Sequence, residues 1–316
     1  MTLLGQFQAG LSIFSTITVL YLLIRLIFWV WLYIRPSSLP RYLHGQTTAW
    51  ALVTGASDGI GKEFARELLA GGFNVILHGR NEVKLSKVKS ELLSVFPSRE
   101  IEIAVADASI LGAEASVVKV VGDRNLTVLV NNVGGHVGGA TYRSLEEYTA
   151  DSLDANINVN LRFPTHLTQR LLPLLKRNQP SLIINIGSLS AVTGPPYLTI
   201  YAGSKAYNQS FSESLSAEMR ANKQDVEVLF VQVGEVVSGS HEVPQGFFTP
   251  DSKTFAKASL KRVGCGYRAV LGFMPHSILI NAWHLMPVWE EMKVKVLTEE
   301  IMKKRKVYES VRVKQQ

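Results

Sequence analysis

Cysteine is almost absent from this sequence, because the 316 residues include only Cys265. A single cysteine excludes internal disulfides and metal clusters held by several thiolates. The seven histidines also lack a metal-ligand spacing such as His-x-x-x-His, so no metal site is predicted. Cys265 itself is interpreted as a small apolar residue.

Long basic runs are missing as well. The net charge is +7, and no stretch of Lys and Arg alternates with aromatic residues as a nucleic-acid surface would, which excludes nucleic acid as a partner. Part of the excess is local: Arg35 and Arg41 follow the first apolar segment, and residues 303–306 are all basic. The apolar content of 47% and the length allow one large α/β domain or two small ones.

Residues 1–10 carry no charge, whereas a cleavable signal peptide usually begins with a positive region. Residues 11–34 are long enough to span a bilayer as one helix. The C-terminal end of this segment is rich in aromatic residues, as an interfacial belt would be: Phe28, Trp29, Trp31 and Tyr33. We therefore predict that residues 1–35 form a retained single-pass anchor. The positive charge that follows the segment places the main domain in the cytosol.

Arg25 is an exception within this segment. Near the middle of a bilayer, an arginine costs roughly 2.5–3.5 kcal/mol on insertion scales. It would snorkel, pair with another group, or mark a segment that lies partly in the interface. The alternative interpretation of residues 11–34 is a buried hairpin packed on the soluble domain.

A linker is predicted at residues 36–47. From residue 48 to about 290, short apolar runs alternate with helix-like runs, which indicates a parallel sheet covered on both faces. The predicted fold is therefore a Rossmann-type, doubly wound α/β domain, followed by a basic helix or tail over residues 291–316. The expected strands are 49–53, 74–78, 101–106, 126–130, 181–186 and 226–233, and the expected helices are 61–69, 83–95, 161–176 and 201–222.

Three glycines lie between the first expected strand and the first expected helix. A strand that turns into a helix through glycines brings backbone N–H groups and a helix N-terminus against a pyrophosphate. Gly55 would permit the turn, Gly59 the close approach to the phosphates, and Gly61 the close packing of helix on strand. An ordinary glycine-rich turn is the alternative. The predicted dinucleotide site includes the whole turn: Gly55, Ser57, Asp58, Gly59, Ile60 and Gly61.

An acidic residue is missing from the end of the second expected strand, where NAD-specific sites carry one for the ribose 2′-OH. Arg80 stands there instead, and a guanidinium suits a 2′-phosphate. Ser57 is close enough in the turn to help. NADP(H) is therefore the predicted cofactor, and the alternative is a solvated arginine at a strand end.

Tyr201 and Lys205 lie one turn apart on the helix expected at 201–222. A neighbouring ammonium favours phenolate and lowers the pKa of a tyrosine, so the pair can exchange a proton with a carbonyl oxygen. Ser188 follows the strand expected at 181–186, where the carboxyl ends of parallel strands form the ligand crevice. Its hydroxyl can bond the same substrate oxygen. Alone, Tyr-x-x-x-Lys would be a helix surface pair; together with Ser188 and the glycine turn it indicates a reductase.

These motifs, in this order across residues 48–240, resemble those of the short-chain dehydrogenase/reductase family. The resemblance implies that Asn160 is the catalytic asparagine whose backbone holds a relay water beside the lysine, with Asn158 as a rival. It also implies that Asp107 holds the adenine and that Asn131, in Asn131-Asn-Val-Gly134, steadies the central strand within the cofactor site.

The segment after the sixth expected strand departs from the family pattern. By resemblance, its residues Gly234, Val236 and Ser238 contact the cofactor. Val233 stands where the family usually has proline, which bears on loop geometry and cofactor affinity but not on the proton chemistry.

A narrower resemblance rests on the N-terminal apolar segment, on residues 58–62, 131–134 and 198–201, and on a long apolar C-terminal region. These features are similar to the microsomal very-long-chain 3-oxoacyl-CoA reductases and the 17β-hydroxysteroid dehydrogenases close to them. The resemblance implies NADPH-dependent reduction of a lipophilic acyl-CoA or sterol ketone at the endoplasmic reticulum membrane, with a homodimer or elongation-complex partners. Only one lysine stands at the C-terminus where a di-lysine retrieval signal needs two, so retention would depend on the anchor.

Three further features leave alternatives open. Residues 236–260 would be a substrate lid or an ordinary surface connection. Residues 269–289, interrupted by Pro275 and Pro287, would be a core strand plus a membrane-facing or dimer-facing amphipathic piece, the alternative being a second membrane span. His136 is interpreted as a solvated loop histidine, the alternative being that it reaches the crevice.

The leading hypothesis is a membrane-anchored, NADPH-dependent reductase of 3-oxoacyl-CoA in fatty-acid elongation, in which Tyr201 supplies the proton. A 17β-hydroxysteroid-type oxidoreductase and a specialised-metabolite ketoreductase are the alternatives within the same enzyme class. A non-catalytic, nucleotide-binding membrane scaffold is the alternative from a different class.

Overall fold

The computed structural model describes residues 3–45, 48–138, 140–239, 243–285 and 289–314. Within them, strands that are all parallel to their neighbours form one seven-stranded sheet. These strands are β1 (Trp50–Thr54), β2 (Asn74–Gly79), β3 (Ile101–Val105), β4 (Leu126–Asn131), β5 (Ser181–Ile186), β6 (Val226–Gln232) and β7 (Ala269–Leu271). Their order is β3-β2-β1-β4-β5-β6-β7, so the chain winds outward in both directions from β1 and β4. Ligands bind at such a switch point in open α/β sheets.

The central strands are apolar because helices cover both of their faces. Every residue of β1, β2, β4 and β5 is buried. Buried parallel strands read as continuous apolar runs rather than as alternating ones, which is why the sequence locates them well. In the register, Val53 lies opposite Val130, and Asn131 opposite Asn185. The segments that follow β1, β4 and β5 therefore meet at the edge of the sheet formed by the carboxyl ends of its strands.

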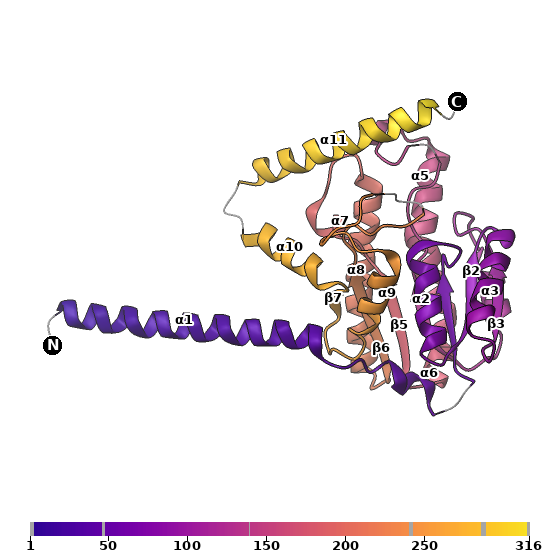
Figure 1. Ribbon diagram of the computed structural model, residues 1–316, viewed down its shortest axis with the longest axis horizontal. Helices are drawn as coiled ribbons and strands as arrows, with labels where there is room; N and C mark the ends of the chain where they lie inside the picture. The colour runs from indigo at the N-terminus through magenta and orange to yellow at the C-terminus, as the bar shows by residue number, and fades with distance from the viewer. Residues whose placement is uncertain (1–2, 46–47, 139, 240–242, 286–288, 315–316) are drawn as a thin grey trace.

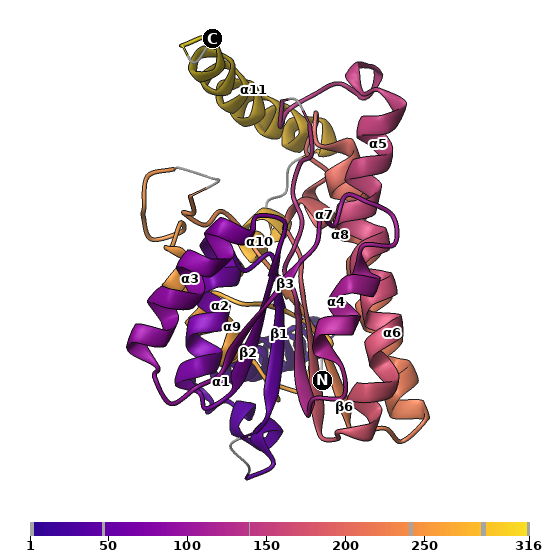
Figure 2. The same ribbon diagram turned by 90° about the vertical axis from the view of Figure 1, so that its right-hand side faces the viewer.

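Two layers of helices pack on the sheet (Figure 2). One layer contains α2 (Gly59–Ala70), α3 (Glu82–Val95) and α9 (Ser252–Leu260), and the other contains α4 (Glu114–Val121), α6 (Phe163–Arg177) and α8 (Thr199–Ala221). Phe64, Leu68 and Phe255 fill the core on the first side, and Leu167 and Met219 fill it on the second. The predicted doubly wound α/β fold is confirmed.

The helix expected at residues 161–176 is longer and interrupted. It starts as α5 (Ala150–Ile157), passes through a π-helical segment at Asn158–Arg162 and continues as α6. Single-turn π segments are frequent at functional sites. The short helix α7 (Ser190–Thr193) precedes α8. Helices α4, α5 and α9 were not among the expected elements.

Helix α1 (Leu3–Ile34) projects away from the sheet as one long rod (Figure 1). Residues Gln6–Ile34 are long and apolar enough to cross a membrane, with a mean hydropathy of 2.1 and none of the apolar window buried in the protein. This segment is a candidate membrane span, and the alternative of a buried hairpin is wrong because α1 is a single exposed helix. The guanidinium of Arg25 donates to the Tyr21 hydroxyl, 3.1 Å away on the next turn, so it has a partner within the helix.

The segment expected as a linker packs closely on the domain. A short 3-10 helix at Leu39–Leu43 buries Tyr42 completely, and the Tyr42 hydroxyl donates to the carboxylate of Glu227. Arg41 pairs with Asp225 at 2.7 Å. Residues 36–45 therefore fix where α1 leaves the domain.

The C-terminal part continues past β7 as α10 (Met274–Leu285) and α11 (Glu290–Lys314). The strand expected within residues 269–289 is β7. The segment 236–260 is not a loop throughout, because it ends in α9, where Phe255 is fully buried; Phe247 and Phe248 are exposed. Residues 240–242 and 286–288, which belong to these two regions, lie outside the described part of the chain.

Candidate functional site

The turn between β1 and α2 requires its glycines. Gly55 and Gly59 adopt φ angles of +65° and +56°, a region that side chains with a Cβ rarely adopt. A Cβ on Gly61 would lie 2.2 Å from the Gly55 carbonyl oxygen. Asp58 caps α2 by accepting a hydrogen bond from the Gly59 N–H at 2.7 Å. The helix N-terminus and the bare backbone of the turn therefore face the sheet edge, as a phosphate site requires.

Of the two adjacent asparagines at the end of β4, the second holds the glycine turn. The side-chain amide of Asn132 donates to the carbonyl oxygens of Thr54 and Gly55, at 2.9 and 3.2 Å. The Asn131 amide points to the other face and donates to Thr168 Oγ1 and Asn185 Oδ1, at 2.9 and 2.8 Å. Successive residues of a strand face opposite ways. Asn131 therefore joins β4 to β5 and α6, away from the glycine turn, and Asn132 is a turn residue that sequence reasoning missed.

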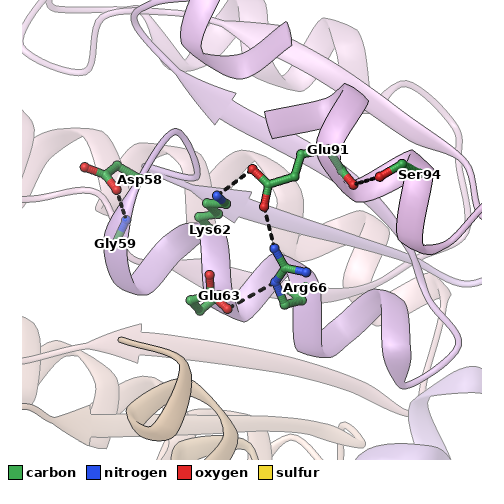
Figure 3. Close-up of polar contacts among 7 residues, drawn as sticks. All are labelled: Asp58, Gly59, Lys62, Glu63, Arg66, Glu91 and Ser94. Carbon is green, nitrogen blue, oxygen red and sulfur yellow. Dashed lines mark hydrogen bonds and ion pairs between the residues drawn. The ribbon is translucent and has the colours of Figure 1, made fainter. Parts of the chain in front are cut away.

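Lys62, which follows the glycine turn, is directed to a neighbouring helix rather than to the turn. Its ammonium and the Arg66 guanidinium contact the two oxygens of the Glu91 carboxylate on α3, at 2.8 and 2.6 Å (Figure 3). The hydrogen bond from Lys62, assisted by both positive charges, lowers the pKa of Glu91. These residues therefore tie α2 to α3.

Arg80 is exposed just beyond β2, where no acidic residue stands. Asp107 lies nearby after β3, and its carboxylate accepts hydrogen bonds from the Ser109 N–H and hydroxyl, at 2.9 and 2.7 Å. Burial disfavours ionisation of Asp107, but the bonds from Ser109 and the charge of Arg80 outweigh it and lower the pKa. Both predicted residues therefore lie at the edge of the sheet where the glycine turn also lies.

Ser188, Tyr201 and Lys205 come together at the end of β5. The Ser188 side chain lies near the Tyr201 hydroxyl and favours its ionised form, and Ser188 Oγ accepts a hydrogen bond from the Ser190 hydroxyl at 2.8 Å. The Lys205 ammonium is buried, donates to the Ile186 carbonyl oxygen at 2.8 Å and lies 5.6 Å from the centroid of the Tyr201 ring. Burial lowers the pKa of Lys205 to about 8. The spacing in the sequence thus predicted a real cluster of side chains.

The expected lowering of the tyrosine pKa is not seen. Burial raises the pKa of Tyr201 above its ordinary value, and the Ser188 side chain offsets this only in part. The Lys205 ammonium lies over the face of the ring rather than beside the hydroxyl, so its charge does little for the phenolate.

Asn160, and not Asn158, lies beside the lysine. A Cβ on Gly134 would lie 3.0 Å from Asn160 Oδ1 and 3.2 Å from Lys205 Nζ, so both polar groups flank this glycine. The Asn160 side chain accepts from the Gly135 N–H at 2.9 Å and donates to the Gly135 carbonyl at 2.7 Å. Its backbone carbonyl accepts a hydrogen bond from the Asn208 amide at 2.9 Å, a partner that the sequence did not reveal.

Asn158 points elsewhere, because its amide donates to the Ser109 carbonyl at 3.0 Å. Lys205, Asn131 and Asn208 line a small cavity with a volume of about 10 Å³. This is room for about one water molecule. Asn131 Oδ1 is buried there without a hydrogen-bond partner among the described residues, as an acceptor for such a water would be.

His136 contacts Tyr201, so its interpretation as a solvated loop residue is wrong. The centroids of the His136 and Tyr201 rings are 5.1 Å apart. Burial lowers the pKa of His136 to about 4, and the ring is therefore neutral at physiological pH. The neutral His136 ring therefore packs beside the Tyr201 ring.

The loop after β6 is fixed by a histidine from α10 that sequence reasoning left without a role. The Gly234 N–H donates to His276 Nδ1 at 3.2 Å, and His276 Nε2 lies 3.0 Å from the Phe248 carbonyl oxygen. A Cβ on Gly234 would lie 2.7 Å from the imidazole, which explains the glycine. Val236 is buried, and Ser238 lies against Gly59, with its Cβ 3.0 Å from where a Gly59 Cβ would stand. The loop therefore reaches the glycine turn.

Residues 49–243 match the family described as short chain dehydrogenase. The chain belongs to the short-chain dehydrogenase family. It is 32% identical over 225 residues to a very-long-chain 3-oxoacyl-CoA reductase of Podospora anserina, a match that covers 70% of this chain and 65% of that protein. It is 33% identical over 270 residues to a very-long-chain 3-oxoacyl-CoA reductase-like protein of Arabidopsis thaliana, covering 79% of this chain and 83% of that protein.

Solved structures agree with the fold of this short-chain dehydrogenase. A 7beta-hydroxysteroid dehydrogenase is 20% identical, with a TM-score of 0.70, over 79% of this chain and 96% of the other. A short-chain dehydrogenase from Sphingobium yanoikuyae, solved with NADPH, is 21% identical, with a TM-score of 0.62, over 75% and 93% of the two chains. At these identities the likeness concerns the fold alone. The family membership makes the chain an oxidoreductase that uses a nicotinamide cofactor.

Proposed function

We propose that this short-chain dehydrogenase is a membrane-anchored, NADPH-dependent reductase that acts on the 3-keto group of long-chain 3-oxoacyl-CoA. The observation that carries the chemistry is the cluster of Ser188, Tyr201 and Lys205 at the sheet edge that also holds the glycine turn. A scaffold without catalysis would have no need for a buried lysine beside a tyrosine, since burying an ammonium costs stability.

The reaction needs a proton donor and a hydrogen-bond donor at one carbonyl oxygen. When bound, the reduced nicotinamide supplies a hydride to the carbonyl carbon. The Tyr201 hydroxyl gives its proton to the carbonyl oxygen, and its raised pKa keeps it protonated until then. The Ser188 hydroxyl donates a hydrogen bond to the same oxygen and stabilises the developing charge. The Lys205 ammonium lies near the Tyr201 ring and would return a proton to Tyr201 through a water molecule that the Asn160 carbonyl helps to hold.

NADPH fits the residues at the sheet edge better than NADH does. The bare backbone at Gly55 and Gly59 suits the pyrophosphate, and Ser238 closes over Gly59. Arg80 is exposed at the position where a 2′-phosphate would lie, with Ser57 in the turn nearby. Asp107 would accept a hydrogen bond from the adenine.

A long acyl-CoA is favoured as substrate by two observations. The proteins of Podospora anserina and Candida glabrata that resemble this chain are both named very-long-chain 3-oxoacyl-CoA reductases. The exposed apolar helix α1 would hold the enzyme at a membrane, where such lipophilic chains gather. With Arg35 and Arg41 on the domain side of α1, the catalytic domain would face the cytosol, at the endoplasmic reticulum.

A chain-length series tests the proposal. The full-length protein in detergent micelles is incubated with 3-oxoacyl-CoA substrates of increasing length, and the absorbance of NADPH or NADH is followed. We expect turnover with NADPH, higher for long chains, and a loss of about 100-fold or more in kcat for Tyr201→Phe. Binding of NADPH without turnover of any 3-oxoacyl-CoA or ketosteroid would favour the scaffold instead.

A further inference from the structure

Helix α10 presents apolar side chains where a soluble protein would present charge. Ile278 and Leu279 are exposed on its outer face, Leu285 at its end is 82% exposed, and Trp289 before α11 is 83% exposed. The opposite face, which includes His276 and Ile280, is buried against the domain. A helix on a water-facing surface normally carries polar or charged residues on its outer side. An exposed apolar patch of this kind marks a binding surface.

The sequence of this region adds a second observation. No Asp, Glu, Lys or Arg occurs between Arg268 and Glu290. Charged residues are costly within the acyl region of a bilayer, so their complete absence suits contact with lipid. Trp283 and Trp289 are also present, and tryptophan favours the boundary between acyl chains and headgroups.

Helix α10 is attached to the candidate membrane span. Trp29 Nε1 on α1 donates to Ser277 Oγ on α10 at 3.1 Å, and the Tyr33 hydroxyl donates to the Leu271 carbonyl at 3.2 Å. Figure 1 shows α10 slanting toward the side from which α1 projects. A bilayer that contains α1 therefore lies directly against the apolar face of α10.

We propose that α10, together with Trp289, is a second membrane contact that enters the headgroup and acyl boundary of the bilayer spanned by α1. The proposal rests on the anchoring proposed above. It names lipid rather than a second copy of this chain, because α1 exposes apolar side chains along its candidate span and contacts α10 near its C-terminal end, so that lipid around α1 also reaches α10. The contact fixes the orientation of the domain on the membrane, in the way that a monotopic helix does.

Fluorescent labels at single cysteines in the full-length chain test this contact. In a Cys265→Ser background, a polarity-sensitive dye is attached at Leu279→Cys or Leu285→Cys, and the protein is reconstituted into phosphatidylcholine vesicles. Leu20→Cys on α1 is the lipid control, and Val83→Cys, which is exposed on α3, is the water control. Quenching is measured with lipids brominated on their acyl chains and, separately, with aqueous iodide.

We expect brominated lipid to quench the labels at Leu279 and Leu285 by at least half as much as the label at Leu20, and iodide to quench only the label at Val83. Iodide quenching at both α10 positions would overturn the proposal. Shielding from both quenchers would also overturn it and would indicate a second copy as the occupant. If iodide, and not brominated lipid, quenches the label at Leu20, the proposed membrane anchor itself is rejected. Turnover of NADPH in the same vesicles reports on the reductase separately.

Discussion

At the scale of single residues, the buried Lys205 is the feature with the clearest cost. Among the described residues its ammonium has one acceptor, the Ile186 carbonyl, and burial lowers its pKa from 10.5 to about 8. At neutral pH the folded protein therefore holds a charge that would be better solvated in the unfolded chain. Such groups persist where activity needs them, at the expense of stability.

Replacing Lys205 with methionine separates these two effects. We expect Lys205→Met to lower kcat about 100-fold or more and to raise the melting temperature at pH 7 by about 2 °C or more. Between pH 8 and 10.5 the unfolded wild type binds more protons than the folded one, so its stability rises with pH. The variant lacks this rise, and its advantage disappears near pH 10.5. Calorimetry from pH 7 to 10.5 checks this; equal destabilisation at every pH would contradict it.

The same residues show which parts of a site can be read from a sequence. Ser188, Tyr201 and Lys205 were predictable, because a strand end and one helical turn place them by local geometry. The pKa of Tyr201 was not, since it depends on burial and on where the ammonium lies over the ring. The roles of His136 and Asn208 depend on contacts between segments that local patterns do not place together.

At the scale of elements, α10 connects α1 to the loop after β6. Its His276 binds the backbone at Gly234 and lies 42 positions away from it in sequence, so no local pattern indicates the contact. The six strands with predicted bounds, in contrast, were each located to within one residue at either end from their apolar runs. The helices α4, α5 and α9 were missed because they are short, and short helices get their stability from tertiary packing.

His276→Ala frees the loop after β6 while leaving the catalytic cluster in place. We expect the KM for NADPH to rise about tenfold, the equivalent of one lost hydrogen bond, with kcat at saturating NADPH changed by less than about threefold. His284→Ala is the matched control, since His284 is exposed on the same helix. Steady-state kinetics of the two variants measures this. A fall in kcat with an unchanged KM would show that His276 does not act through the loop.

The link between α2 and α3 is a second case at this scale. Glu91→Gln removes the carboxylate that contacts both Lys62 and Arg66 (Figure 3), and we expect the free energy of unfolding at pH 7 to fall by about 0.5–1 kcal/mol. The folded pKa of Glu91 is lowered, so this stabilisation is present above the ordinary value of 4.5 and is lost as pH falls through the folded pKa.

Urea unfolding at pH 7 and at pH 3 measures this difference, and Lys87→Gln, an exposed substitution on the same helix, serves as the control. An unchanged urea midpoint for Glu91→Gln at pH 7 would mean that solvent completely screens the attraction of Glu91 to Lys62 and Arg66.

At the scale of the whole molecule, the end of α1 belongs to the folded domain and its remainder does not. The guanidinium of Arg262, itself buried, donates to the carbonyl oxygens of Leu32 and Tyr33. Leu32 also packs on the core that contains α2 and α9. The composition identified α1 as one apolar segment. It could not separate the part that is exposed from the part that packs on the domain, because residues that contact lipid and residues that fill a protein core are equally apolar.

Two truncations test this division. Removal of residues 1–26 should leave the melting temperature within about 2 °C of the full chain in detergent, since the side chains of residues 6–26 are all exposed. Removal of residues 1–35 should lower it by about 5 °C or more, because Arg262 loses the Leu32 and Tyr33 carbonyls, keeping only that of Ala258 among the described residues, and the core loses Leu32. Circular dichroism of both proteins in one detergent gives the comparison. If both truncations unfold at the same temperature, residues 27–35 add nothing to the domain and α1 is an anchor along its whole length.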